Sequence, residues 1–204
     1  MQETISVYDL VAPCYAARVA YPLERELERF RRMMPAGGLA LDVGCGPGEY
    51  TRSLNMRGLR TVGLDLSRGM LRYARIQGSS QLVCADMRRI PLVAEYADGC
   101  FVCASLLHLP RSQAPQAFLE FRRVLRPGGA LYLGVKEGEG AKWVTGSEGH
   151  ARFFVYYQPE EIDLLIRAAG FEIVDGWISP PGKNQRHNWI NRFVVKEFPP
   201  EALR

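Results

Sequence analysis

The segment Leu39–Tyr50, LALDVGCGPGEY, decides the fold, because an apolar run leads directly into an acidic, glycine-rich turn. Its first five residues are predicted to form a buried strand. Gly44, Gly46 and Gly48 then alternate along the turn, where glycine permits backbone conformations that other residues avoid and lets amides approach a ligand. Helical spacing begins at Glu49. The segment therefore predicts a strand, turn and helix that bind a small molecule, with a ligand-free connection as the alternative.

A second predicted strand, Leu59–Leu64, ends at Asp65, which lies 65 − 42 = 23 positions beyond Asp42. A carboxylate about 20 residues past such a turn can accept hydrogen bonds from both ribose hydroxyls. The alternative role for Asp65 is to cap the helix predicted over residues 67 to 77. Ser67 is the natural cap for that helix, so Asp65 is expected to be free to bind a ligand.

A third short apolar run, residues 81 to 85, ends at Asp86. Asp42, Asp65 and Asp86 would then lie along one carboxyl edge of a sheet, where open α/β folds bind ligands. The glycine spacing is G-x-G-x-G, and Glu49 occupies the place where a dinucleotide-binding enzyme needs its third glycine. No Gly-Lys-Ser/Thr follows, as a phosphate-binding loop requires. The pattern favours a single nucleoside over a dinucleotide.

These motifs together resemble those of class I S-adenosylmethionine-dependent methyltransferases. DVGCGPG resembles the first motif of that family, GLDLS its ribose-binding strand end, and CADMRRIPL its adenine loop. FVCASLLHL resembles the segment at the end of strand four, and RRVLRPGGALYLGV the helix, turn and strand that follow. RFFVYYQPEEIDLLIRAAGFEIV is similar to the later part of many small-molecule members. The resemblance implies an α/β fold with a doubly wound, mostly parallel seven-stranded sheet, helices on both faces and the last strand antiparallel.

The resemblance also implies S-adenosyl-L-methionine as the cofactor and S-adenosyl-L-homocysteine as the product. The methionine part would be held by the glycine turn, the ribose by Asp65, and the adenine by the loop at Asp86. A tyrosine-containing segment near the start of the chain would close over the donor. No metal is expected. The expected cofactor-binding residues are Tyr8, Tyr15, Asp42, Gly44, Cys45, Gly46, Asp65, Leu66, Asp86, Met87 and Ser105.

His108 is the candidate catalytic residue, because it lies three positions past Ser105 on the same edge of the sheet. A hydroxyl, thiol or ammonium acceptor must lose a proton, and histidine is suited to accept it near neutral pH. The alternative is that His108 only caps the adjoining helix. The acceptor itself is expected to be a small, partly apolar organic molecule. Its pocket would be formed by the N-terminal segment, residues 137 to 158 and the loop 179 to 190.

With 204 residues, of which 47% are hydrophobic, the chain is predicted to form one methyltransferase domain. Two local expectations accompany this prediction. The N-terminal segment is expected to be bent or divided into two pieces at Pro13, and residues 137 to 149 are expected to form a mobile, solvent-facing segment. The predicted parts are an N-terminal helical cap (1–36), a donor-binding core (37–136), an acceptor lid (137–158) and a C-terminal helix with strands (159–204).

The net charge is +4, a mild basic excess spread along the chain, which does not favour nucleic-acid binding. Five scattered cysteines indicate a reducing compartment, and Cys100 and Cys103 are interpreted as core residues on opposite faces of a strand. No apolar stretch is long enough for a membrane span and no leader is evident, so a cytoplasmic location is expected. The alternative functions are a non-catalytic S-adenosylmethionine-binding protein and an RNA or protein methyltransferase.

Overall fold

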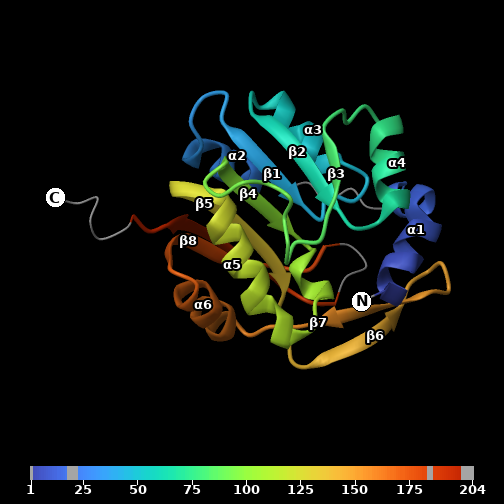
Figure 1. Ribbon diagram of the computed structural model, residues 1–204. Helices are drawn as coiled ribbons and strands as arrows, with labels where there is room; N and C mark the ends of the chain where they lie inside the picture. Colours follow the sequence, from blue (N-terminus) through green and yellow to red (C-terminus); the bar gives the residue numbers. More distant parts are fainter. Residues whose placement is uncertain (1, 18–22, 183–185, 199–204) are drawn as a thin grey trace.

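The computed structural model describes residues 2–17, 23–182 and 186–198, and a seven-stranded sheet is its main feature (Figure 1). The strand order is β3-β2-β1-β4-β5-β9-β8. Neighbouring strands from β3 to β5 are parallel, whereas β9 is antiparallel to both β5 and β8. The predicted fold class, including the antiparallel last strand, is confirmed. The strands are β1 Leu39–Val43, β2 Arg60–Asp65, β3 Leu82–Cys84, β4 Ala97–Cys103, β5 Leu125–Lys136, β8 Phe171–Ser179 and β9 Trp189–Lys196.

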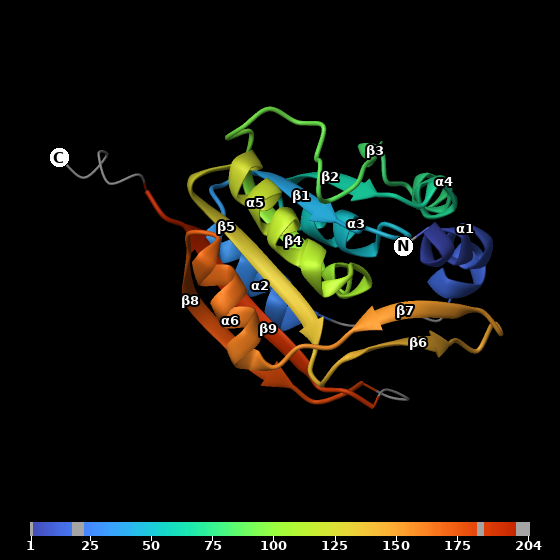
Figure 2. The same cartoon turned by 60° about the horizontal axis from the view of Figure 1, so that its bottom comes forward.

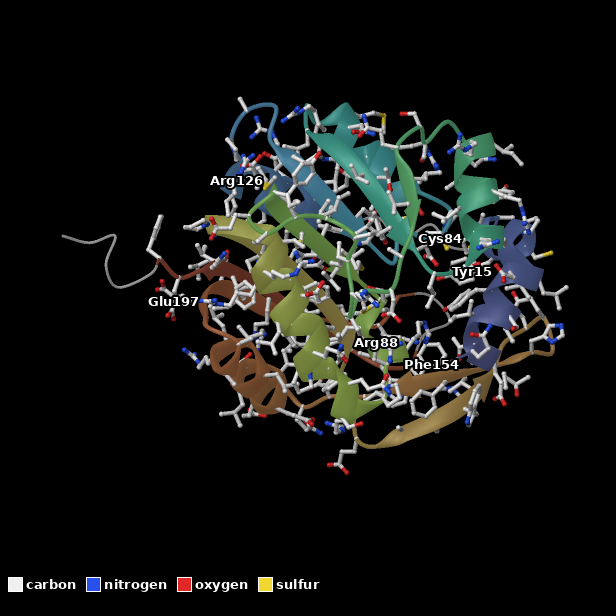
Figure 3. The ribbon with its side chains drawn as sticks, in the orientation of Figure 1. Tyr15, Cys84, Arg88, Arg126, Phe154 and Glu197 are labelled. Atoms are coloured by element: carbon white, nitrogen blue, oxygen red, sulfur yellow. The ribbon has the colours of Figure 1, made fainter. Side chains whose placement is uncertain are left out.

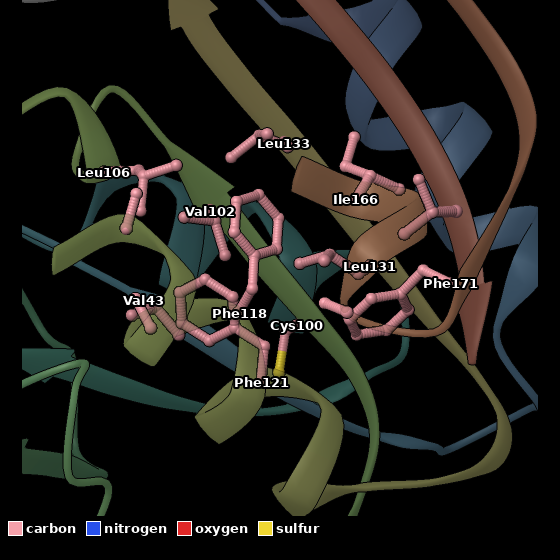
Figure 4. Close-up of a cluster of buried hydrophobic side chains, with 14 of the residues drawn as sticks. Val43, Cys100, Val102, Leu106, Phe118, Phe121, Leu131, Leu133, Ile166 and Phe171 are labelled. Carbon is pink, nitrogen blue, oxygen red and sulfur yellow. The ribbon is translucent and has the colours of Figure 1, made fainter. Parts of the chain in front are cut away.

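Helices cover both faces of this sheet. Apolar side chains of α5 and α6 pack with those of β4 and β5 in the larger core cluster (Figure 4), and side chains of α2 and α3 belong to the cluster on the other face. α4 lies beside β3, and α1 packs against α4. The helices are α1 Gln2–Ala16, α2 Glu24–Met33, α3 Glu49–Met56, α4 Arg68–Ile76, α5 Ala114–Val124 and α6 Pro159–Ala168, with short 3-10 turns at Leu106–His108 and Arg111–Gln113.

Strand β4 lies at the centre of the sheet and is apolar on both faces, as strands of a parallel sheet covered by helices must be. Cys100 is fully buried in the α5 and α6 cluster, whereas Cys103 packs against the α2 cluster. The two thiols thus point to opposite faces and both are free, as predicted. β4 is therefore buried in the middle of the sheet. Its carboxyl end leads into the chain segment that carries His108.

A two-stranded hairpin extends from the sheet toward α1 (Figure 2). It pairs β6, Ala141–Thr145, with β7, Ala151–Val155, in antiparallel register. None of residues 137 to 149 is buried, as expected for a solvent-facing segment, but they contain a regular strand that was not predicted. Glycine and acidic residues hid the strand in the sequence, but the cross-strand pair Trp143 and Phe153, with ring centroids 5.6 Å apart, stabilises it.

The N-terminal segment forms the single helix α1, which includes Pro13, so the two-piece alternative is wrong. Pro13 lies in the last turn of the helix, where its missing N–H removes the hydrogen bond to one carbonyl four residues earlier. The next turn still forms, because the Ala17 amide donates to the Pro13 carbonyl over 3.3 Å. A proline so close to the helix end interrupts few hydrogen bonds.

Candidate functional site

The glycine turn after β1 has the predicted conformation, since Gly44, Gly46 and Gly48 all have positive φ values of 76°, 51° and 76°. A Cβ atom on Gly44 would lie 2.2 Å from the Cβ atom of Ser105, so only glycine fits there. A Cβ atom on Gly46 would meet nothing within 4 Å. The turn is thus packed from behind at Gly44 and open at Gly46.

The amides of this turn are used differently from the prediction. The Gly44 and Cys45 N–H groups both donate to the Leu64 carbonyl, at 2.7 and 2.9 Å, and the Gly46 N–H donates to Asp65 Oδ2 at 2.8 Å. The prediction that these amides face a ligand is wrong, because β2 takes their hydrogen bonds. These bonds hold the turn rigidly against the end of β2, and the open face of Gly46 is what remains for a ligand.

Asp65 takes part in these hydrogen bonds. The expectation that its carboxylate is free is therefore wrong. Its Oδ1 atom accepts the Ser67 N–H at 2.8 Å while Oδ2 accepts the Gly46 N–H. Burial raises the pKa of Asp65, although the hydrogen bonds from Ser67 and Gly46 oppose the shift. Ser67 does cap α4, as predicted, by accepting the Met70 N–H. Each carboxylate oxygen can accept more than one hydrogen bond, so Asp65 keeps capacity for ribose hydroxyls.

Asp42 lies behind the pocket wall and is only 1% exposed. Its Oδ2 atom accepts a 2.6 Å hydrogen bond from the Thr51 hydroxyl. Burial raises the pKa of Asp42 to about 7, and that hydrogen bond only partly opposes the shift. Asp42 therefore supports the turn from below, and it is not among the residues that line the pocket.

The carboxyl end of β4 closes the pocket next to the glycine turn. Ala104 has a φ of 53°, an unusual conformation for a residue with a Cβ atom, and it turns the chain out of the strand. Ser105 follows and donates its hydroxyl hydrogen to the Val43 carbonyl at 2.7 Å. This bond ties β4 to β1 at the site. Strain at Ala104 gave no signal in the sequence.

Asp86 and Met87 line the pocket at the end of β3, as expected. The Asp86 carboxylate accepts hydrogen bonds from the backbone and guanidinium N–H groups of Arg88. Burial would raise the pKa of Asp86, but these bonds hold it below its usual value. Asp86 is therefore ionised at neutral pH and held in place by its neighbour.

Helix α1 forms the opposite wall of the pocket and is tied to the core at two elements. Asp9 Oδ1 accepts hydrogen bonds from the Ser67 hydroxyl at 2.8 Å and the Gly69 N–H at 2.6 Å, at the start of α4. At β7, the Phe153 N–H donates to the Thr4 hydroxyl over 3.1 Å. These contacts bring Tyr8 and Tyr15 to the pocket, where their rings meet edge to face at 5.4 Å.

His108 lies where α1, the hairpin and the end of β4 meet. Its Nδ1 atom is 2.7 Å from the Phe153 carbonyl, which can only accept, so Nδ1 carries the proton. Its Nε2 atom lies 2.7 Å from the Tyr8 hydroxyl and accepts a hydrogen bond from it. Burial, together with the nearby charges of Arg152 and Lys136, lowers the pKa of His108 to about 4, although the hydrogen bond to the Phe153 carbonyl opposes the shift. The imidazole is therefore neutral at physiological pH.

The glycine turn, the carboxyl ends of β2, β3 and β4, and helix α1 line a pocket that runs from the glycine turn to His108. Apart from Asp42, every predicted cofactor-binding residue lines it, as does His108. The pocket suits a methyl donor with a nucleoside, because the acids Asp65 and Asp86 face it beside an apolar wall that includes Leu66 and Met70. The lining residues that sequence reasoning missed are Thr4, Ile5, Val43, Pro47, Glu49, Tyr50, Met70, Ala85, Cys103, Ala104 and Leu109.

Comparison with known proteins gives the family. Residues 41–133 match the model described as a methyltransferase domain. The ubiquinone biosynthesis O-methyltransferase of Xanthomonas axonopodis pv. citri is 30% identical over 175 residues, which cover 76% of this chain and 72% of that protein. The chain belongs to the S-adenosylmethionine-dependent methyltransferases.

Other relatives of this methyltransferase are longer than the match. The malonyl-[acyl-carrier protein] O-methyltransferase of Serratia marcescens is 37% identical over 134 residues, 64% of this chain and 51% of that protein. The chain spans between a quarter and about half the length of the first curated relatives it matches. Two relatives, from Mus musculus and Arabidopsis thaliana, are named tRNA (carboxymethyluridine(34)-5-O)-methyltransferases. They are 30% and 31% identical to this chain, and each match covers 65% of it. The matches cover 20% and 32% of the two relatives' own lengths.

A solved structure confirms the methyltransferase fold. An S-adenosylmethionine-dependent methyltransferase from Methanosarcina mazei aligns with a TM-score of 0.77 at 18% identity, over 88% of this chain and 99% of that one. At that identity the likeness concerns the fold alone. Within the described parts of the methyltransferase, no cluster of metal-ligating side chains occurs and no helix is long and apolar enough to cross a membrane.

Proposed function

We propose that the protein transfers the methyl group of S-adenosylmethionine to a small organic acceptor. The observation that carries this proposal is the pocket that joins the glycine turn and Asp65 to His108 and α1. When bound, the cofactor supplies an electrophilic methyl group. The chain's own task is then to align the acceptor with that methyl and to exclude water.

The donor would be held by the part of the pocket between β1 and β3. Asp65 would accept the ribose hydroxyls, and the open face of Gly46 would adjoin the methionine part. Leu66 would pack on adenine, whose edge Asp86 and Met87 would contact. Ser105 and Cys45 would complete the methionine side, with Asp42 supporting the turn from behind. Tyr8 and Tyr15 would cover the donor from α1.

His108 is proposed as the group that takes the proton of the acceptor. Its Nδ1 proton is held by the Phe153 carbonyl, so Nε2 is the atom that can accept another. An acceptor hydroxyl would replace the Tyr8 hydroxyl, which occupies Nε2 here. The alternative is structural, because the same two hydrogen bonds join α1 to the hairpin. The test by substitution is given in the Discussion.

The acceptor would lie beside His108, at the edge of the hairpin, and the aromatic rings of this region suit a small, partly apolar molecule. Phe154 packs against His108 at 4.7 Å between ring centroids, and it stacks with Tyr156. Residues 137–158 would thus act as the acceptor lid of a single-domain protein. The expected loop 179 to 190 falls partly outside the described residues. Five free cysteines support a cytoplasmic location.

Calorimetry and a turnover assay test the proposal together. We expect S-adenosylmethionine and S-adenosylhomocysteine to bind, NAD not to bind, and a panel of small hydroxylated acceptors to include one whose mass increases by one methyl. Tight NAD binding without donor binding would contradict it. Donor binding without turnover on any acceptor would instead support a non-catalytic donor-binding protein, which the Tyr8–His108 closure of the site favours.

An RNA acceptor is the second candidate, and the two relatives named for tRNA favour it. We propose a small molecule instead, because eight arginines of the described residues are already paired with acids of this chain. Methylation of total RNA by the purified protein, at a rate above that of any small acceptor, would reverse this choice.

A further inference from the structure

Three cations surround the aromatic rings of the acceptor side. Arg152, on β7, places its guanidinium carbon 5.2 Å from the Tyr8 ring centroid and 5.9 Å from that of Phe154 (Phe154 and Tyr15 are labelled in Figure 3). Lys136, at the end of β5, places Nζ 4.5 Å from the Phe154 ring. Lys142, on β6, places Nζ 5.0 Å from the Tyr156 ring. The three residues come from three strands and meet over one group of rings.

None of these three cations forms any of the nine ion pairs found among the described residues. Elsewhere eight arginines and Lys196 are paired with acids. Glu148 lies near Arg152, since a Cβ atom on Gly146 would be 2.6 Å from Glu148 Oε2 and 2.9 Å from Arg152 Nη2, but the two do not appear among those ion pairs. The acceptor side therefore carries a local excess of positive charge.

Lys136 shows what this excess costs. Its side chain is half-buried, and burial together with the charges of Arg152 and Lys142 lowers its pKa. A partly desolvated ammonium beside like charges is unfavourable unless an anion compensates it, and contact with an aromatic ring compensates only part. A bound anion would therefore be stabilised beside Lys136 and Arg152.

This positive region adjoins the methyl-transfer pocket. Arg152 Nη1 is 3.5 Å from the Tyr8 hydroxyl, and that hydroxyl is 2.7 Å from His108 Nε2. Tyr8 and His108 both line the pocket. Only the Tyr8 side chain would therefore separate His108 from a group bound to Arg152. The guanidinium is planar, and its paired N–H donors match the two oxygens of a carboxylate.

We propose that the acceptor carries a carboxylate, which Arg152 and Lys136 bind while its apolar portion lies in the pocket beside Tyr8 and His108. This inference rests on the proposed methyl transfer and narrows its substrate class. A phosphate backbone fits less well, because Lys136 and Arg152 are half-buried among rings and only Lys142 is exposed. The carboxylate serves only to bind the acceptor. A different atom of the acceptor, placed next to His108, receives the methyl group.

Calorimetric titration with a matched pair of probes tests the proposal. The protein is first saturated with S-adenosylhomocysteine and then titrated with phenylacetate or with phenylacetamide, which differ only in the charged group. We expect phenylacetate to bind at least about tenfold more tightly, as hydrogen bonds to charged groups imply. Arg152→Gln and Lys136→Gln should each abolish most of this preference. Arg167→Gln, which removes one charge from an exposed position on α6, should keep it.

Each other result overturns the inference. Equal affinity for the two probes, including no measurable binding of either, shows that no carboxylate site exists. A preference for the acid that survives in both Arg152→Gln and Lys136→Gln places the site elsewhere. A short oligoribonucleotide that binds more tightly than phenylacetate, and loses affinity in the same variants, assigns the cations to RNA. The initial titration separates the two proposals, since failure to bind S-adenosylhomocysteine contradicts methyl transfer itself.

Discussion

The two sides of the pocket are built in different ways. On the donor side, the turn from Gly44 to Gly48 is held by hydrogen bonds to Leu64 and Asp65, all within one strand-turn-helix-strand unit. On the acceptor side, Tyr8, His108 and Arg152 meet through side chains that are about a hundred residues or more apart in sequence, counting Tyr8 to His108 and Tyr8 to Arg152. The comparison indicates that a local motif is enough to shape the donor side, whereas the acceptor side depends on long-range packing.

Substitution of His108 should produce the largest effect and should be confined to the acceptor side. If His108 accepts the proton of the acceptor, His108→Ala should lower turnover by about 10²–10⁴-fold while leaving donor affinity unchanged. Steady-state kinetics with a known acceptor and donor calorimetry measure the two quantities. Tyr8→Phe is the control, because it removes the hydroxyl from Nε2 and keeps the imidazole. Unchanged turnover per folded molecule of His108→Ala would remove His108 from the catalytic residues.

Asp42 should make the donor side pH-sensitive in stability. Its pKa is about 7 in the folded protein and about 3.9 in an unfolded chain, so the folded state favours the protonated form. Below about pH 4 the titration of Asp42 does not change the free energy of unfolding. As the pH rises from about 4 toward 7, that free energy falls. His108, whose folded pKa is about 4, acts with the opposite sign over a similar range.

Comparison of wild type with Asp42→Asn isolates the Asp42 contribution. The variant should gain about 2–3 kcal/mol relative to wild type between pH 5 and pH 8, since one pKa unit corresponds to about 1.4 kcal/mol. Urea unfolding of both proteins without donor at the two pH values measures this difference. A constant difference between the proteins would show that Asp42 titrates normally.

Asp65 should affect the donor side of the pocket and leave the acceptor side unchanged. Asp65→Ala removes the acceptor of the Gly46 and Ser67 N–H groups and the proposed ribose partner. Donor affinity should fall by about ten- to a hundredfold, corresponding to about 1.5–3 kcal/mol. Asp86→Ala is the comparison, because Asp86 accepts its hydrogen bonds from Arg88 and not from the glycine turn, so its loss should weaken donor binding less. Equal dissociation constants for wild type and folded Asp65→Ala would place the ribose elsewhere.

The glycine turn offers a matched pair for the smallest effect. Gly44→Ala and Gly46→Ala place a Cβ atom on residues with positive φ, but only at Gly44 would it collide with Ser105. The backbone strain is similar in both, so Gly44→Ala should be less stable than Gly46→Ala by about 1–3 kcal/mol, the usual cost of overpacking. Thermal unfolding compares them. Equal stabilities would mean that Ser105 moves away without cost.

Several features of the site were predictable because short-range chemistry sets them. Ser67 caps α4 as its side chain predicts, and Gly44 and Gly46 adopt the conformations that glycine alone tolerates. Strand ends bring Asp65 and Asp86 to the pocket because parallel strands share one carboxyl edge. The β6 strand was missed, since its pairing with β7 depends on Trp143 meeting Phe153 across the hairpin and not on an alternating pattern.

By itself, the sequence determined the parallel sheet, the glycine turn and the family of donor, because strand periodicity, glycine spacing and helix caps act over a few residues. Only the tertiary structure decided that Asp42 lies behind the pocket wall and that the turn amides serve β2. It also decided the tautomer of His108 and its place beside Arg152. The physical reason is that burial, protonation and unpaired charge depend on which distant segments pack together, and no local pattern records that.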